Sequence, residues 1–158
     1  MNEPDKESSQ REESQRRALL LDPDLFFAVK VSATLKHLGF ETVTARQLND
    51  WKRRLESERF DLALVNTAAR GVEWATAITA ARDVGLPLIA YGSHVDTEAQ
   101  ALARAAGATR VIANSRLAAD LPTIVEQTLR RARASTERAA AEPAKPAPTT
   151  GAVEDDDA

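Results

Sequence analysis

Polar side chains capable of chemistry stand directly after several short apolar runs of this sequence. Asp22 and Asp24 follow the apolar run 19–21, and Asn66 follows the apolar run 62–65. A carboxylate in such a place can bind a divalent cation or take up a phosphoryl group. An amide can only donate and accept hydrogen bonds. Asn66 therefore puts an amide where a reactive site would need a carboxylate.

Weaker candidates follow two later apolar runs. Gly92 and Ser93 come after the run 87–91, and Asn114 comes after the run 110–113. Ser93 and His94 could suggest a nucleophile and a base, but adjacent side chains rarely face one another usefully. Because no acid, base and nucleophile converge, we expect no enzyme. The glycine patterns of nucleotide-binding loops are absent as well.

The apolar runs alternate with segments of helical periodicity. The predicted strands cover 17–21, 40–45, 62–65, 87–91 and 110–113, and the predicted helices cover 25–38, 48–57, 72–84, 97–106 and 121–133. Gly39, Gly85 and Gly107 are typical helix ends, and Asp96 is a typical helix cap. We expect Trp51 and Trp74 to be at least partly buried against the sheet.

This alternation with short connections requires a parallel sheet covered by helices on both faces. Five strands in such a pattern predict an α/β fold, the flavodoxin-like (βα)5 doubly wound parallel sheet with strand order 2-1-3-4-5. The carboxyl ends of the strands then meet at one edge. The candidate residues expected to line that edge are Asp22, Asp24, Asn66, Gly92, Ser93 and Asn114.

Composition limits the organisation and the partners of the chain. Of its 158 residues we assign 1–16 to a disordered arm, 17–133 to one domain and 134–158 to a disordered Ala/Pro-rich acidic tail. A net charge of −3, from 21 basic and 24 acidic residues, disfavours nucleic acid as a partner. With no cysteine and no apolar run of the roughly 20 residues that span a bilayer, we expect a cytoplasmic protein that does not enter a membrane.

Four stretches carry a likeness to a known family. They read LLLDPD at 19–24, FDLALV at 60–65, LPLIA at 86–90 and AAGA at 105–108. Over 17–129 the chain resembles the CheY-like receiver domain of bacterial two-component response regulators. The resemblance implies an acidic pair after strand one that holds magnesium, and a phosphoacceptor aspartate that ends strand three. It also implies a threonine or serine that ends strand four and a lysine that ends strand five.

Several positions depart from the pattern that the resemblance implies. Asp22 falls on the first acidic position, but the second is a proline, and Asp24 lies one residue further on. Asn66 stands at the phosphoacceptor position, and Asn114 stands at the lysine position. Gly92 stands at the hydroxyl position, with Ser93 beside it as a substitute after a small shift. These are degenerate versions of the family's site residues, so the resemblance implies a pseudo-receiver.

The losses have chemical consequences. With a neutral amide opposite, Asp22 should bind magnesium weakly at best, and we expect no other cofactor. As an alternative to metal binding, we favour Asp22 as a solvated strand-end residue or as a cap for the helix that begins at Leu25. Asp24 lies at the same helix start, where an acidic residue is stabilising. Tyr91 is close to the usual place of the family's switch aromatic, but we interpret it as a structural core residue.

The favoured function is that of a stand-alone pseudo-receiver signalling protein that acts by protein contacts without aspartate phosphorylation. The family's usual partner face would here comprise the helix 97–106, the strand 110–113 and the helix from Leu121, and a homodimer through it is open. One alternative is a phosphorelay receiver whose acceptor has moved to Asp22 or Asp24. Another is a flavodoxin-like sensor of a small molecule, which rests on fold analogy alone.

Overall fold

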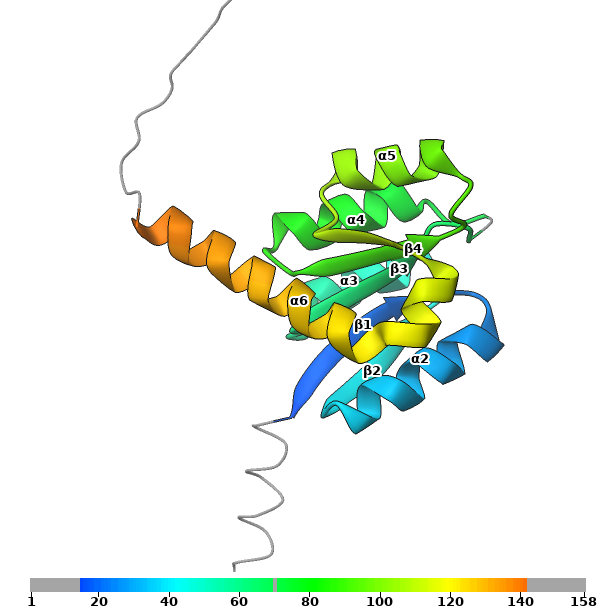
Figure 1. Cartoon of the computed structure of the whole chain (residues 1–158), viewed down its shortest axis with the longest axis horizontal. Helices are drawn as coiled ribbons and strands as arrows, with labels where there is room; N and C mark the ends of the chain where they lie inside the picture. The colour runs from blue at the N-terminus through cyan, green and yellow to red at the C-terminus, as the bar shows by residue number, and fades with distance from the viewer. Residues whose placement is uncertain (1–14, 70, 142–158) are drawn as a thin grey trace, which may run out of the picture.

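Five parallel strands form one sheet in the order β2-β1-β3-β4-β5 (Figure 1). The computed structural model describes residues 15–69 and 71–141. Its strands are β1 (Arg16–Leu21), β2 (Phe40–Ala45), β3 (Leu62–Asn66), β4 (Leu88–Gly92) and β5 (Arg110–Ala113). Its helices are α2 (Leu25–His37), α3 (Leu48–Ser57), α4 (Trp74–Asp83), α5 (Thr97–Ala106) and α6 (Asn114–Ala141). The predicted fold class and strand order are confirmed.

Side chains alternate between the two faces of the sheet, as the period of a β-strand requires. Leu20 and Leu64 join a core with α2 and α6, whereas Leu19 and Val65 join a core with α3, α4 and α5. Helices therefore cover both faces (Figure 1). Because both faces are buried, the central strands are continuously apolar.

Local signals of the sequence set several helix ends. Asp24 Oδ1 accepts hydrogen bonds from the backbone N–H groups of Phe26 and Phe27 at 3.1 and 3.3 Å, and so caps α2. Asp96 Oδ1 caps α5 by accepting from Ala99 N at 3.0 Å. Gly107 ends α5 with a φ of 113°, in the left-handed region that glycine adopts without strain.

Both tryptophans help to attach helices to the sheet. Trp51 on α3 is fully buried, and its Nε1 donates a hydrogen bond to the carbonyl of Ala77 on α4 at 3.0 Å. Trp74 is half-buried against the same core. The expected burial of both is confirmed, and the indole N–H of Trp51 joins two neighbouring helices.

The last helix differs from the sequence prediction at both ends. The segment from Leu121 is helical as predicted, but α6 already begins at Asn114 and bends at Asp120, whose φ of −139° is not helical. Pro122 is tolerated because it lies in the first turn after that bend. The helix then continues to Ala141, past the helix end predicted at residue 133. The rest of the predicted tail and residues 1–14 of the predicted arm lie outside the described residues.

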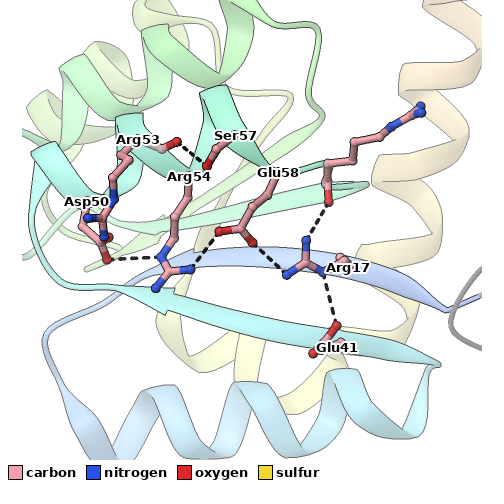
Figure 2. A network of polar contacts seen from close by, with 8 residues as sticks. Arg17, Glu41, Asp50, Arg53, Arg54, Ser57 and Glu58 are labelled. Atoms are coloured by element: carbon pink, nitrogen blue, oxygen red, sulfur yellow. Dashed lines mark hydrogen bonds and ion pairs between the residues drawn. The ribbon is translucent and has the colours of Figure 1, made fainter.

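At the amino edge of the sheet, charged side chains of β1, β2 and α3 form a network of ion pairs (Figure 2). Arg17 contacts Glu41 at 3.2 Å and Glu58 at 2.8 Å. Glu58 also contacts Arg54 at 3.0 Å, and Arg54 contacts Asp50 at 3.3 Å. The network joins the start of the first two strands to the end of α3.

No helix in residues 15–69 and 71–141 is both long enough and apolar enough to cross a membrane.

Candidate functional site

Three polar side chains meet at the carboxyl edge of the sheet because of strand register. Leu21 pairs with Val65, and Asn66 pairs with Tyr91. Asp22, one residue after Leu21, is therefore next to Asn66. Asp22, Asn66 and Tyr91 are each an even number of positions away from a residue of the core beneath α2 and α6. Side chains alternate between the faces of a strand, so these three share the face that α2 and α6 cover.

The Asp22 carboxylate is fully buried and fully engaged. Its Oδ1 accepts hydrogen bonds from Asn66 Nδ2 at 3.1 Å and from the Asp24 backbone N–H at 2.9 Å, and its Oδ2 accepts one from the Tyr91 hydroxyl at 2.7 Å. A buried charge is stable only when it is compensated in this way. The expectation that Asp22 is solvated or caps α2 is wrong. Asp24, not Asp22, caps the helix, because Asp22, directly after β1, is fully buried and bonded to Asn66 and Tyr91.

The amide of Asn66 is used on both sides. Its Nδ2 donates to Asp22, and its Oδ1 accepts from the backbone N–H of Ala68 at 2.8 Å. Only one orientation of the amide satisfies both neighbours, since a flipped amide would face oxygen with oxygen and N–H with N–H. An aspartate at this position would set two carboxylates against each other.

Tyr91 completes this group of residues from β4. Its side chain is fully buried, and its ring lies 5.4 Å from that of Phe27 on α2. Burial raises the pKa of the Tyr91 hydroxyl well above its usual value, and the negative charges of Asp22 and Asp24 and the hydrogen bond to Asp22 raise it further. The hydroxyl therefore remains a neutral donor to Asp22. We name Asp22, Asn66 and Tyr91 the buried triad.

Thr67 fills the space beside Gly92. Its Oγ1 donates to the carbonyl of Tyr91 at 3.3 Å, and its backbone N–H donates to the same carbonyl at 2.8 Å. A Cβ atom added to Gly92 would overlap Thr67 Oγ1. Gly92 thus has no room for the side chain that the resemblance implies there. The sequence reasoning overlooked Thr67, although its place one residue after the strand β3 was a usable signal.

Two predicted residues stay outside the buried triad. Ser93 is exposed, and its Oγ accepts from the backbone N–H of Val95 at 3.3 Å, which uses the hydroxyl within its own loop. Asn114 is half-buried at the start of α6, and its Oδ1 has no hydrogen-bond partner in the part of the chain that the structure describes. Of the predicted site residues, the structure brings together the side chains of Asp22 and Asn66 and the backbone N–H of Asp24. The third side chain in this group is Tyr91, and not Ser93 or Asn114.

The donor set does not fit a magnesium ion. Magnesium requires oxygen ligands in nearly octahedral arrangement. Asn66 turns its N–H2 group toward Asp22, and both oxygens of Asp22 already accept hydrogen bonds. In residues 15–69 and 71–141, no three His, Asp or Glu side chains lie close enough together to hold a metal.

The fold is that of known receiver domains. A CheY-like receiver domain protein from Methanospirillum hungatei JF-1 matches with a TM-score of 0.68 and 22% identity, over 77% of this chain and 99% of that one. The receiver domain of an HD domain-containing protein from Pseudomonas fluorescens Pf-5 matches with a TM-score of 0.69 and 18% identity, over 79% and 94% of the two chains. The receiver domain of a putative LuxO repressor from Vibrio parahaemolyticus matches with a TM-score of 0.67 and 16% identity, over 78% of this chain and 97% of that one.

Comparison with protein-family profiles gives no match, and no curated protein matches by sequence. The structural likeness therefore establishes the receiver-domain fold, at identities too low to transfer the activity of any neighbour. What the chain does must be argued from its own side chains.

Proposed function

We propose that this chain is a pseudo-receiver, a signalling protein that works by protein contacts and does not accept a phosphoryl group on an aspartate. The buried triad carries the proposal. Asn66 ends β3 with an amide whose two polar ends are both engaged, and a phosphoryl acceptor must be a free nucleophile.

The neighbouring contacts support the same conclusion. A receiver responds to phosphate when a hydroxyl after β4 moves toward it, but Thr67 occupies the space at Gly92. Asp22 is buried and Asp24 caps α2, so a relocated acceptor would have to give up existing hydrogen bonds. Nothing in these contacts favours catalysis, and we propose that the chain is not an enzyme.

The partner surface we propose is the face of α5, β5 and α6. Leu102 on α5 is 52% exposed, and Val95 just before α5 is 72% exposed. The alanines of α5 make it narrow, which allows close approach of another helix. A protein partner, or a second copy of the chain, would bury these apolar side chains.

The test of the proposal is intact-mass analysis after incubation with acetyl phosphate and magnesium, with the wild-type chain beside Asn66→Asp. We expect no phosphoryl mass on the wild type and a gain on Asn66→Asp. The matched controls are Asp22→Asn and Asp24→Asn, which each remove one of the carboxylates near the site. A phosphoryl mass on the wild type would overturn the proposal, and its loss in one control would identify the relocated acceptor.

A further inference from the structure

A hollow of about 340 Å³ lies at the amino edge of β4 and β5, whereas the buried triad lies at the carboxyl edge of the sheet. Its walls come from the loops before these two strands and from the second half of α6. The residues that define it are Arg82, Pro87, Thr109, Arg131, Ser135 and Thr136. Figure 1 shows this part of α6 running out past the sheet.

Two arginines, Arg82 and Arg131, line this hollow, and Arg110 lies next to it at the start of β5. Arg131 Nη1 donates to the carbonyl of Thr109 at 3.3 Å, which holds its guanidinium at the rim. Partial burial lowers the pKa of Arg110, and the like charges of Arg131 and Arg116 lower it further. Arg110 Nη1 donates to the neutral side-chain oxygen of Gln127 at 2.6 Å, and among the described residues neither Arg110 nor Arg131 forms an ion pair with an acidic side chain.

The neighbouring guanidinium groups of Arg110 and Arg131 therefore make this a place where added negative charge would be stabilising. Arg82, on the opposite wall, contacts its own neighbour Asp83 at 3.2 Å and contributes less net charge. Ser135 also lines the hollow, and its hydroxyl can donate a hydrogen bond to a carboxylate, whereas the hydroxyl of Thr136 already donates to the carbonyl of Ala132 at 3.0 Å. A short acidic peptide matches this combination of charge and polar groups.

The same chain carries such a peptide at residues 154–157, which read Glu-Asp-Asp-Asp. From Ala141 to Glu154 the chain advances by 13 residues (154 minus 141), which spans up to about 43 Å when extended. Arg131 lies 10 helical residues before Ala141, which is about 15 Å along the helix axis. The acidic segment can therefore reach the hollow without strain.

We propose that this hollow is a docking surface for an acidic peptide, and that its occupant is the chain's own segment 154–157. Tethering makes the encounter intramolecular, so a weak contact is populated at an effective concentration in the millimolar range. Bound there, the segment would cover the late part of α6 and would compete with any acidic partner protein. The inference does not depend on the proposed function, because it concerns the opposite edge of the sheet.

The experiment places a spin label on Ala158→Cys, which is specific because the chain has no other cysteine. We expect the label to broaden the amide NMR signals of residues 107–109 and 131–136 in the intact chain. Arg131→Glu should abolish the broadening, as should the tail variant Asp155→Lys with Asp156→Lys. Combining both changes should restore it, because the charges are then exchanged. Arg46→Glu, the same charge reversal at the opposite sheet edge, should leave it intact.

Two results would overturn the proposal. The first is a spectrum in which these amides keep their intensity, or lose it equally in Arg131→Glu and in the wild type. The second comes from a mixture in which the label and the ¹⁵N are on different molecules. Broadening in that mixture equal to that in the doubly labelled chain would place the acidic segment on a second copy.

Discussion

The two edges of the sheet hold their polar side chains in opposite ways. At the carboxyl edge, Asp22 is fully buried and its single charge is compensated by neutral donors from Asn66, Tyr91 and the backbone. At the amino edge, the ion pairs of Figure 2 are open to water, with about 30% of the Arg17 side chain and 27% of the Glu58 side chain exposed. The first arrangement excludes solvent, and the second tolerates it.

This difference decides how each edge responds to a lost partner. At the amino edge, water replaces a missing ion-pair partner, so an exposed pair contributes only about 0–1 kcal/mol. At the carboxyl edge, a buried donor left without its acceptor costs about 1–3 kcal/mol, because water cannot reach it. The carboxyl edge, where open parallel sheets usually build a site, is here part of the buried core.

Removing the central carboxylate should have the largest effect. Asp22→Ala leaves Asn66 Nδ2 and the Tyr91 hydroxyl without their acceptor, so we expect the free energy of unfolding to fall by about 3 kcal/mol. Urea unfolding followed by circular dichroism measures it. The matched control is Asp24→Ala, which removes the α2 cap and should cost about 1 kcal/mol. Equal losses in the two variants would mean that burial does not set Asp22 apart from the exposed cap residue Asp24.

A side chain at Gly92 should be the next most disruptive change. Gly92→Ser forces its Cβ against Thr67 Oγ1, and we expect overpacking to cost about 2 kcal/mol of unfolding free energy. Thr67→Ala in the same chain should recover most of that loss, because it removes the overlapping hydroxyl. A double-mutant cycle measured by thermal unfolding tests the coupling. Additive effects of the two changes would show that Thr67 is not the obstacle.

The hydroxyl of Tyr91 should contribute less than the carboxylate that accepts from it. Tyr91→Phe removes one of three donors to Asp22, and we expect a loss of about 1 kcal/mol at neutral pH. We also expect the contribution of this hydroxyl to the free energy of unfolding to depend on pH. Since the pKa of Tyr91 is raised on folding, its contribution is complete below the unfolded value of about 10 and falls as the pH rises above it.

Alkaline unfolding measures this pH dependence directly. The wild type should lose more stability than Tyr91→Phe between pH 8 and 11, and the difference isolates the hydroxyl. The chain has a single tyrosine, so the absorbance change of phenolate formation reports on Tyr91 alone. A normal titration near pH 10 in the folded chain would mean that the hydroxyl is not held in the core.

The sequence predicts the fold better than it predicts the site. Alternating strands and helices fixed the order β2-β1-β3-β4-β5, because short connections leave few topologies. Convergence of Asp22 and Asn66 followed from that order. The orientation of Asp22 did not, since the residue after a strand can turn toward the core or toward solvent, and only packing against Tyr91 decides between them.

The missed features have the same origin. Thr67 beside Gly92 and the hydroxyl of Tyr91 on Asp22 are contacts across the sheet between residues 25 and 69 positions apart. Such contacts cannot be predicted from the residue periodicity of any single segment. The early start of α6 was missed because the helical turns before Asp120 carry Asn114 and Ser115, which are typical of loops.

The smallest effect is expected at the amino edge. Partial burial alone would raise the pKa of Asp50, but hydrogen bonds and charges from Arg53 and Arg54 outweigh it and lower the pKa. Its contribution to stability is therefore present above the unfolded value of about 3.9 and is lost as the pH falls through the lower folded value. At neutral pH we expect Asp50→Asn to cost about 0.5 kcal/mol.

Salt separates this weak contribution from the buried one. The effect of Asp50→Asn should shrink further in 1 M sodium chloride, where the screening length falls to about 3 Å. The loss in Asp22→Ala should persist in the same buffer, because it arises from unsatisfied buried groups rather than from exposed charges. Urea unfolding of both variants at low and high salt measures the two losses of unfolding free energy. If Asp50→Asn cost as much as Asp22→Ala in high salt, the ion pairs of Figure 2 would be as protected as the core, and the two edges would not differ in kind.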